Sequence, residues 1–179
     1  MRFWQSLFVY VWTASLLGTW YELVLSQVMT AVTGDSSWWR PITPATVLHF
    51  AEPYGLGAAA LILVVVPLRQ RYAWRPWLVL VVSGLVGAAV ELVSALALVA
   101  ALGRNPFWDF SSYPFDLYGL TSLVSVLVFG LLATPFVSWV YPATAPVLDR
   151  VAPLPMAVAC TGMLVLYVAA LTVKLSSLG

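Results

Sequence analysis

Charged residues are scarce in this chain: only 8% of its 179 residues are Asp, Glu, Lys or Arg, whereas 62% are hydrophobic. This balance lies far outside the range of soluble globular proteins. The net charge is +1, and the chain contains no run of basic residues. Because proteins that bind nucleic acid need clustered Lys and Arg side chains, the sequence argues against a nucleic-acid partner.

Cysteine and lysine are each represented by a single residue, Cys160 and Lys174. One cysteine excludes an internal disulfide and a Cys-x-x-C redox or zinc motif. Cys160 lies inside an apolar run, so we interpret it as a small packing residue. Lys174 lies at the end of the last apolar run, so the chain has no Walker A phosphate loop and no ATP hydrolysis of that kind.

Apolar runs of about 20 residues, the length that crosses a bilayer core, recur along the chain. Alternation with a period of two is absent, which argues against a β-barrel. We therefore predict an all-α integral membrane protein, a bundle of five transmembrane helices that forms one domain over residues 1–179. The expected spans are Phe3–Met29, Val47–Leu68, Trp77–Leu102, Leu117–Val140 and Leu154–Val173.

The distribution of basic residues predicts the orientation in the cell membrane, because Lys and Arg favour the cytoplasmic side. One side would carry Arg2, Arg69, Arg71, Arg75 and Arg150, and the other Arg40, Arg104 and Lys174. This modest excess predicts a cytoplasmic N-terminus and a C-terminus outside. The chain is rich in tryptophan, and the interfacial anchors on the cytoplasmic side would be Trp4, Trp74, Trp77 and Trp139.

Six ionisable side chains are expected in the outer leaflet of the bundle: Glu22, His49, Glu52, Glu91, Asp109 and Asp116. A charge inside a membrane is costly, so such residues normally face the bundle interior or water. Their shared depth predicts an outward-facing, carboxylate-lined pocket. The alternative for Glu22 and Glu91 is a purely structural hydrogen bond to a neighbouring serine or backbone group.

Helical spacing places small and polar residues on one face of the first span and on one face of the third. The first face consists of Ser15, Gly18, Glu22 and Ser26, and the second of Gly84, Gly87, Glu91 and Ser94. Small residues allow helices to approach closely, so we expect these two faces to pack against each other. The fifth span contains no acid and is expected to be a packing or lipid-facing helix.

The second span begins unusually, because the stretch HFAEPYGLG places Pro53 directly after Glu52. Proline lacks a backbone donor and disfavours helix at the preceding residue. We expect a broken or re-entrant start between His49 and Tyr54, of the kind that often lines a binding site. The three-residue spacing of His49 and Glu52 could present metal ligands or an acid–base pair, or the two residues could have a capping or interfacial role near the membrane surface. A lone histidine with acids is a weak metal signal, so we predict no metal site.

The stretch FWDFSSYPFDLYG, Phe107–Gly119, connects the third and fourth spans. We expect it to form a lid over the pocket with its two acids turned inward. The alternatives are a capping role or a partnership with Arg104 for Asp109, and an N-cap role on the fourth helix for Asp116. Tyr54, Trp108 and Tyr118 could contact the ligand or anchor the protein at the interface.

Several of these stretches occur in the order of a known family: GTWYE ending at Glu22, EPYGLGA, Glu91, WDFS from Trp108, and then Asp116 and Gly119. They resemble the glycine-aromatic-x-x-glutamate, proline-x-tyrosine-glycine and tryptophan-aspartate-aromatic-serine signatures of a bacterial membrane-protein family described as Putative ABC-transporter type IV. The resemblance covers the chain up to about Gly130 and implies a helical membrane fold, a site at these residues and a role related to transport.

The chain also departs from that family pattern. Asp116 stands where the family usually has asparagine, Leu120 stands where an arginine often follows the glycine, and WWRPITP replaces an arginine-glycine sequence. The extra acid and the missing arginine would make the pocket more negative. A more limited likeness, in size, aromatic content and the stretch HFAE, is to five-helix sterol isomerase-like proteins and tryptophan-rich sensory proteins.

Three classes of function fit these observations. The favoured one is a small polytopic membrane protein whose pocket binds or translocates a small ligand or cation, alone or as a transporter subunit. The second is an intramembrane enzyme of isomerase or cyclase type that uses buried carboxylic acids on a lipid-like substrate. The third is an accessory subunit of a larger membrane complex. The sequence names no cofactor, and the expected partners are the bilayer, a small or lipid-like ligand, and other subunits.

Overall fold

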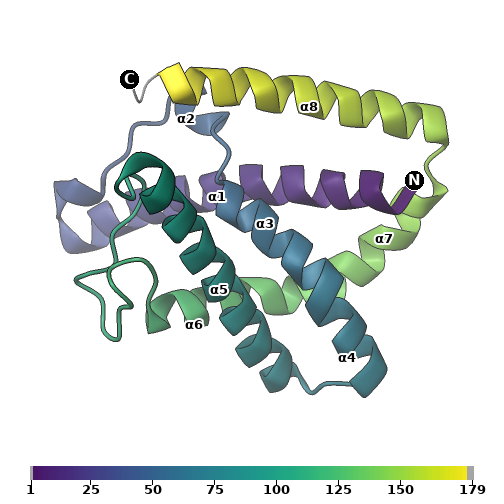
Figure 1. Ribbon diagram of the computed structural model, residues 1–179, viewed down its shortest axis with the longest axis horizontal. Helices are drawn as coiled ribbons and strands as arrows, with labels where there is room; N and C mark the ends of the chain where they lie inside the picture. The colour runs from purple at the N-terminus through teal and green to yellow at the C-terminus, as the bar shows by residue number, and fades with distance from the viewer. Residues whose placement is uncertain (1, 177–179) are drawn as a thin grey trace. The chain divides into compact units, whose positions relative to one another are not determined.

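The structure, a computed structural model, describes residues 2–176, and these are helical throughout apart from short connections (Figure 1). The α-helices are α1 (Arg2–Thr33), α2 (Pro44–Val47), α3 (Glu52–Ala60), α4 (Val66–Tyr72), α5 (Pro76–Leu102), α6 (Leu123–Pro135), α7 (Tyr141–Arg150) and α8 (Pro153–Ser176). The π-helical turns Leu61–Val65 and Phe136–Val140 join α3 to α4 and α6 to α7 without a break. A short 3-10 turn, Ser36–Trp38, follows α1.

Five helices are long and apolar enough to cross a membrane: Arg2–Thr33, Pro44–Tyr72, Pro76–Leu102, Leu123–Arg150 and Pro153–Lys174. The predicted all-α fold with five transmembrane helices is therefore confirmed. The predicted third span agrees with α5 to within one residue at its start. The apolar runs locate the spans well because their length alone distinguishes them from the connections.

The start of the fourth span was predicted wrongly. The helix begins at Leu123 rather than Leu117, because the preceding residues form a turn in which the Leu117 amide donates to the Thr121 carbonyl at 2.8 Å. Its N-cap is Ser122, whose hydroxyl accepts from the Ser125 amide at 3.3 Å. Asp116 is therefore not the cap of this helix.

The predicted break in the second span is confirmed. The short helix α2 ends at Val47, the backbone from His49 to Ala51 is non-helical, and α3 begins at Glu52. Pro53 follows in the first turn of α3, where its missing N–H costs no helical hydrogen bond. The Ala51 amide donates to the Ser15 carbonyl of α1 at 3.1 Å, so the break is fixed to the neighbouring span.

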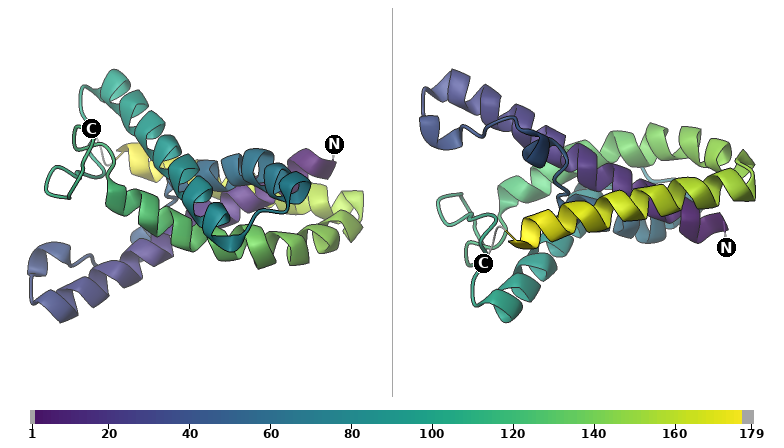
Figure 2. Two further views of the ribbon diagram at one scale, coloured as in Figure 1. Left: turned by 90° about the horizontal axis from the view of Figure 1, so that it is seen from below. Right: turned by 90° about the horizontal axis from the view of Figure 1, so that it is seen from above.

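The chain divides into two compact units, the first formed by residues 1–55 and 151–179 and the second by residues 56–150. In the first unit, α8 lies alongside α1 and runs in the same direction (Figures 1 and 2). The Trp12 indole donates to the Met163 carbonyl at 2.9 Å, and Cys160 lies 3.8 Å from the Gln5 carbonyl. That all five spans form one domain stays a prediction.

Glycines allow close helix contacts within each unit. In the first unit, a Cβ atom at Gly18 would overlap the Tyr54 ring of α3. In the second unit α5 and α6 cross (Figure 2), and a Cβ atom at Gly84 would overlap the Val126 backbone carbonyl. Each small-residue face therefore has a partner inside its own unit, and the packing of the two faces against each other stays a prediction.

The second unit also contains both π-helical turns, and each turn ends just before a proline. In the second turn, the Tyr141 amide donates to the Phe136 carbonyl, and the next residue, Pro142, has no N–H to offer Val137. The Arg69 guanidinium donates to this Val137 carbonyl at 3.0 Å instead. The first turn repeats the pattern with Val66 and Pro67. Proline thus explains the irregular helix, and Arg69 satisfies a carbonyl that the irregularity leaves without its helical donor.

Candidate functional site

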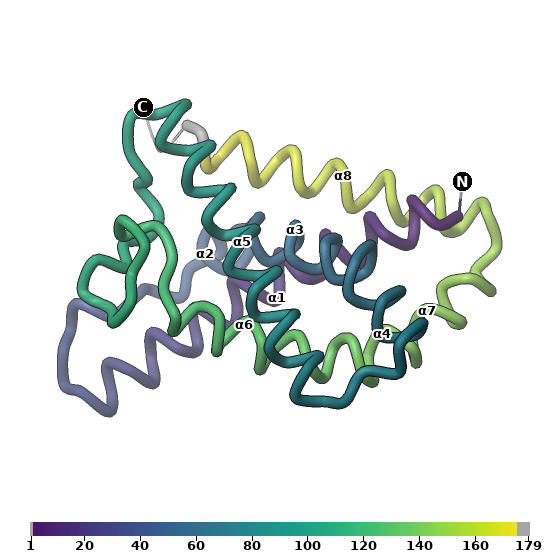
Figure 3. Tube along the Cα trace, turned by 60° about the horizontal axis from the view of Figure 1, so that its bottom comes forward, coloured from purple at the N-terminus to yellow at the C-terminus, as the bar shows by residue number. Residues whose placement is uncertain are grey.

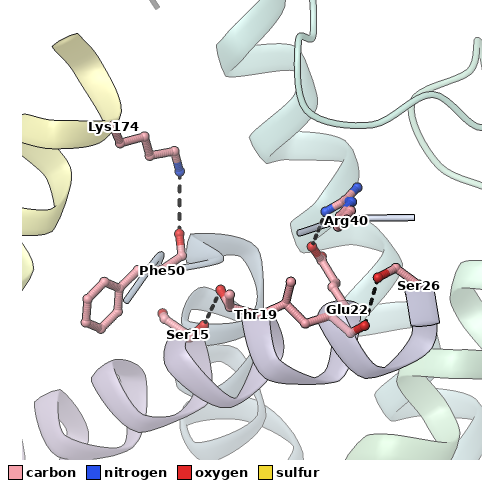
Figure 4. A network of polar contacts seen from close by, with 8 residues as sticks. Ser15, Thr19, Glu22, Ser26, Arg40, Phe50 and Lys174 are labelled. Atoms are coloured by element: carbon pink, nitrogen blue, oxygen red, sulfur yellow. Dashed lines mark hydrogen bonds and ion pairs between the residues drawn. The ribbon is translucent and has the colours of Figure 1, made fainter. Parts of the chain in front are cut away.

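The first charged pair of the site joins α1 to the loop that follows it. An Arg40 guanidinium nitrogen lies 3.3 Å from a Glu22 carboxylate oxygen (Figure 4). Tyr54 is a further side-chain hydrogen-bonding partner of Glu22. The Gln27 side-chain amide donates to the Arg40 carbonyl at 2.7 Å, which holds the loop against α1. The Arg40 and Glu22 side chains are 56% and 38% exposed, so this pair lies at the surface of the unit.

The second charged pair joins α8 to the broken start of the second span. The Lys174 ammonium nitrogen lies 2.7 Å from a Glu52 carboxylate oxygen and 3.4 Å from the Phe50 carbonyl oxygen. The Lys174 and Glu52 side chains are only 14% and 31% exposed. The Phe50 ring makes edge contacts with Trp12 and Tyr167, with both centroid distances at 5.3 Å. Rings from α1 and α8 therefore hold the non-helical segment in place.

The two pairs form one electrostatic cluster. Glu22 interacts electrostatically with Lys174 as well as with Arg40. His49, which is partly buried, interacts electrostatically with Lys174, Glu52 and Arg40. We call Glu22, Arg40, Glu52 and Lys174 the paired-charge cluster. Its members come from α1, the following loop, the first residue of α3 and the last turns of α8.

The connection Phe107–Gly119 is a compact loop that is closed by its own backbone (Figure 3). The Phe110 amide donates to the Gly119 carbonyl at 2.9 Å, and the Trp108 indole donates to the Leu120 carbonyl at 3.0 Å. Gly119 has a φ of 69°, and a Cβ atom there would lie 2.9 Å from an Asp109 carboxylate oxygen. Glycine is therefore needed at this position for both conformation and space.

Both aspartates of this loop bond to the loop itself. Asp109 accepts from the Ser111 amide at 2.9 Å, and Asp116 accepts from the Gly119 amide at 2.8 Å. Both residues are exposed, which corrects the expectation that the acids turn inward. The hydrogen bonds from the Ser111 amide and hydroxyl hold the pKa of Asp109 below its usual range. Short polar side chains commonly stabilise turns in this way.

The structure brings together four of the eight predicted site residues in the first unit: Glu22, His49, Glu52 and Tyr54. In the second unit, Trp108, Asp109 and Asp116 share the connection, and Glu91 is buried on α5 with 7% of its surface exposed. Among residues 2–176 no group of three or more His, Cys, Asp or Glu side chains is arranged to hold a metal ion.

Sequence reasoning missed the contribution of the fifth span. The expectation of a packing or lipid-facing helix is incomplete, because α8 supplies Lys174 to Glu52. One signal was available: Lys174 is the single lysine of the chain and lies at the end of a span that was expected to finish on the same side as Glu52. Tyr167 carries no such signal, because a tyrosine in an apolar helix is ordinary.

Comparison with known proteins gives one match. Residues 10–175 match the model of the family described as Putative ABC-transporter type IV. No curated protein and no solved structure matches the chain. The matched region includes all four members of the paired-charge cluster.

Proposed function

Because the chain belongs to the family described as Putative ABC-transporter type IV, we propose that this membrane protein binds or translocates a small ligand or cation at the paired-charge cluster. It would do so alone or as a transporter subunit. The observation that carries the proposal is that two carboxylates in membrane-spanning helices are each matched by a basic side chain from a different segment. Such intramembrane charges are expensive and usually mark a functional site.

The surroundings of the cluster support binding rather than packing alone. The non-helical segment His49–Ala51 presents backbone polar groups beside Glu52, and such backbone is tolerated at membrane depth only next to protein or a wet cavity. In this proposal the site faces outward, with the N-terminus cytoplasmic and the C-terminus outside. That Glu91, Trp108, Asp109 and Asp116 contact the ligand stays a prediction.

A thermal-unfolding experiment tests this function. The purified protein is titrated in detergent with NaCl, KCl, MgCl2 or methylammonium chloride at constant ionic strength, and the midpoint Tm is measured. A ligand that binds only the folded state raises Tm in a saturable way. We expect at least one of these cations, or one of the charged organic probes described below, to do so, and we expect Glu22→Gln and Glu52→Gln to abolish the rise. Asp35→Asn, which changes an exposed acid outside the spans, serves as the matched control.

A second candidate is the accessory subunit, in which the charges only lock the fold. It is favoured by the fact that both carboxylates already have basic partners. In that case the Glu→Gln variants would lower the starting Tm, yet their response to each probe would equal that of the unchanged protein. That result would contradict the binding proposal.

A further inference from the structure

We infer that the ligand of the paired-charge cluster is zwitterionic, with a primary ammonium group and an anionic carboxylate or phosphate group a few bonds apart. The inference rests on the proposed function and narrows it to one chemical class. It follows from the charge balance of the cluster, the unequal burial of its two pairs and the identity of its basic side chains.

The charge balance comes first. The cluster holds two carboxylates and two basic groups, so its net charge is zero. A bare cation bound at Glu22 would meet the displaced Arg40 and also Lys174, which already interacts with Glu22. A bare anion would meet the opposite problem at Glu22 and Glu52. A ligand with both charges leaves the balance unchanged, so no resident charge loses its partner in a poorly solvated site.

The two pairs differ in how easily they open. Arg40 and Glu22 are the more exposed pair at 3.3 Å, and ion pairs exposed to solvent contribute little to stability. Lys174 is more deeply buried, and its ammonium also contacts the Phe50 carbonyl at 3.4 Å. Opening the inner pair would leave a poorly solvated ammonium group behind. The outer pair is therefore the point of entry, and the inner pair remains closed.

The chemistry of the outer pair assigns the two ends of the ligand. The Glu22 carboxylate receives the ammonium group in place of Arg40. The freed Arg40 guanidinium, a planar fork of donors, then binds the carboxylate or phosphate of the same ligand. Lys174 stays paired with Glu52. Because it is a fixed positive charge near Glu22, it disfavours the binding of ligands that carry only a positive charge.

Two sources could provide this chemistry, a free amino-acid-like or phosphoamine molecule and the headgroup of a lipid such as phosphatidylethanolamine. The free ligand is tested in detergent with three matched probes: phosphoethanolamine, ethanolamine and inorganic phosphate. The lipid is tested by comparing Tm in nanodiscs of phosphatidylethanolamine with Tm in nanodiscs of phosphatidylglycerol, which lacks the ammonium group.

We expect phosphoethanolamine to raise Tm at a concentration at least about tenfold lower than ethanolamine, phosphate or an equimolar mixture of the two, because joining the charges makes the second contact intramolecular. Arg40→Gln should reduce its effect to that of ethanolamine, and Glu22→Gln to that of phosphate. Arg40→Lys retains the positive charge and should keep part of the gain. Asp35→Asn should leave every response unchanged. If only the phosphatidylethanolamine nanodiscs raise Tm, and Glu22 and Arg40 are both required, the ligand is the lipid headgroup.

The inference is overturned if ethanolamine or a metal cation alone raises Tm as effectively as phosphoethanolamine through Glu22, although the proposed binding function would then stand. It is also overturned if phosphoethanolamine raises Tm no more effectively than ethanolamine or phosphate does, and Tm is the same in nanodiscs of phosphatidylethanolamine and of phosphatidylglycerol. If no probe gives a rise that depends on Glu22 or Glu52, the proposed function fails together with it.

Discussion

The contacts that stabilise the inside of the first unit differ from those that stabilise the inside of the second. In the first unit, charged side chains and aromatic rings connect segments that are far apart in sequence, such as Glu52 and Lys174. In the second unit, glycines bring the backbones of α5 and α6 into contact, and an apolar core of Val65, Val79 and Val137 fills the space between helices. Both units use close glycine contacts, and the first unit adds to them charged pairs that connect segments far apart in sequence.

Charged pairs and glycine contacts differ in whether a contact can exchange one partner for another. An ion pair can open and accept another ion of the same sign, as proposed for Glu22 and Arg40. A close glycine contact cannot exchange partners in this way, because it depends on two backbones that fit together in one geometry. Charged pairs that can exchange partners are what we would expect of a region that binds a ligand.

The largest effect should come from adding one methyl group to the packed unit. Gly84→Ala would place a Cβ atom on the Val126 backbone carbonyl, which cannot move aside as a side chain can. We expect the free energy of unfolding in detergent to fall by about 1–3 kcal/mol, measured by thermal or denaturant unfolding.

The matched control is Gly162→Ala on α8, where a Cβ atom would meet nothing within 4 Å. This change should be neutral or stabilise the protein by up to about 1 kcal/mol, because alanine is the better helix former. Equal effects at the two glycines would remove the contrast between the units.

A middle-sized effect is expected where an arginine side chain bonds to the backbone of the second unit. Arg69→Met keeps the apolar stem but removes the donor to the Val137 carbonyl, and should cost about 1–1.5 kcal/mol in unfolding free energy. Arg75→Met, at an exposed arginine just before α5, should change the unfolding free energy by no more than about 0.5 kcal/mol.

A double-mutant cycle shows whether proline is the reason for this dependence. Pro142→Ala restores an N–H that the Val137 carbonyl can accept. In the Pro142→Ala background, Arg69→Met should therefore cost less than about 0.5 kcal/mol. If its cost is the same with and without Pro142, the guanidinium acts through packing or charge and not through the carbonyl.

The smallest effect concerns pH and the exposed connection. Hydrogen bonds from Ser111 lower the pKa of Asp109 in the folded protein. Their stabilisation is therefore fully present above the ordinary aspartate pKa of about 3.9, and is lost as pH falls through the lowered folded value. Amide hydrogen exchange of Phe107–Gly119, corrected for its intrinsic pH dependence, should show protection that decreases only in this acidic range.

This measurement is made in an Asp116→Asn background, so that Asp109 is the aspartate of the connection that titrates. Asp109→Asn keeps an oxygen acceptor for the Ser111 amide but cannot titrate, so its protection should be independent of pH. Protection that changes with pH equally in both proteins would assign the loss to another group.

The sequence was sufficient to predict the features that depend on local signals. The length of the apolar runs located the five spans, and Pro53 located the break at His49–Ala51. Both signals act over a few residues and need no knowledge of the tertiary structure. The start of the fourth span was misplaced because residues 117–122 are partly apolar, whereas a turn closed through Thr121 decides their conformation.

The candidate site was less accessible to prediction because its contacts are long-range. Their expected depth in the membrane identified Glu22, His49 and Glu52 as candidate site residues. The residues next to Glu52 in the sequence do not indicate that Lys174 is its partner. Likewise, the spacing of Asp109 and Asp116 does not show that both accept hydrogen bonds from their own loop. Convergence of Glu22, Glu52, Glu91 and Asp109 in one pocket stays a prediction.

The separation of Glu52 and Lys174 by 122 residues also has a consequence for the order in which the protein is made. A membrane protein is inserted as it is synthesised, so α3 reaches the membrane well before α8 exists. During that interval the Glu52 carboxylate and the Phe50 carbonyl lack the ammonium group that later contacts both. This contact between the second and fifth spans therefore forms only when the fifth span is inserted and its end reaches the second.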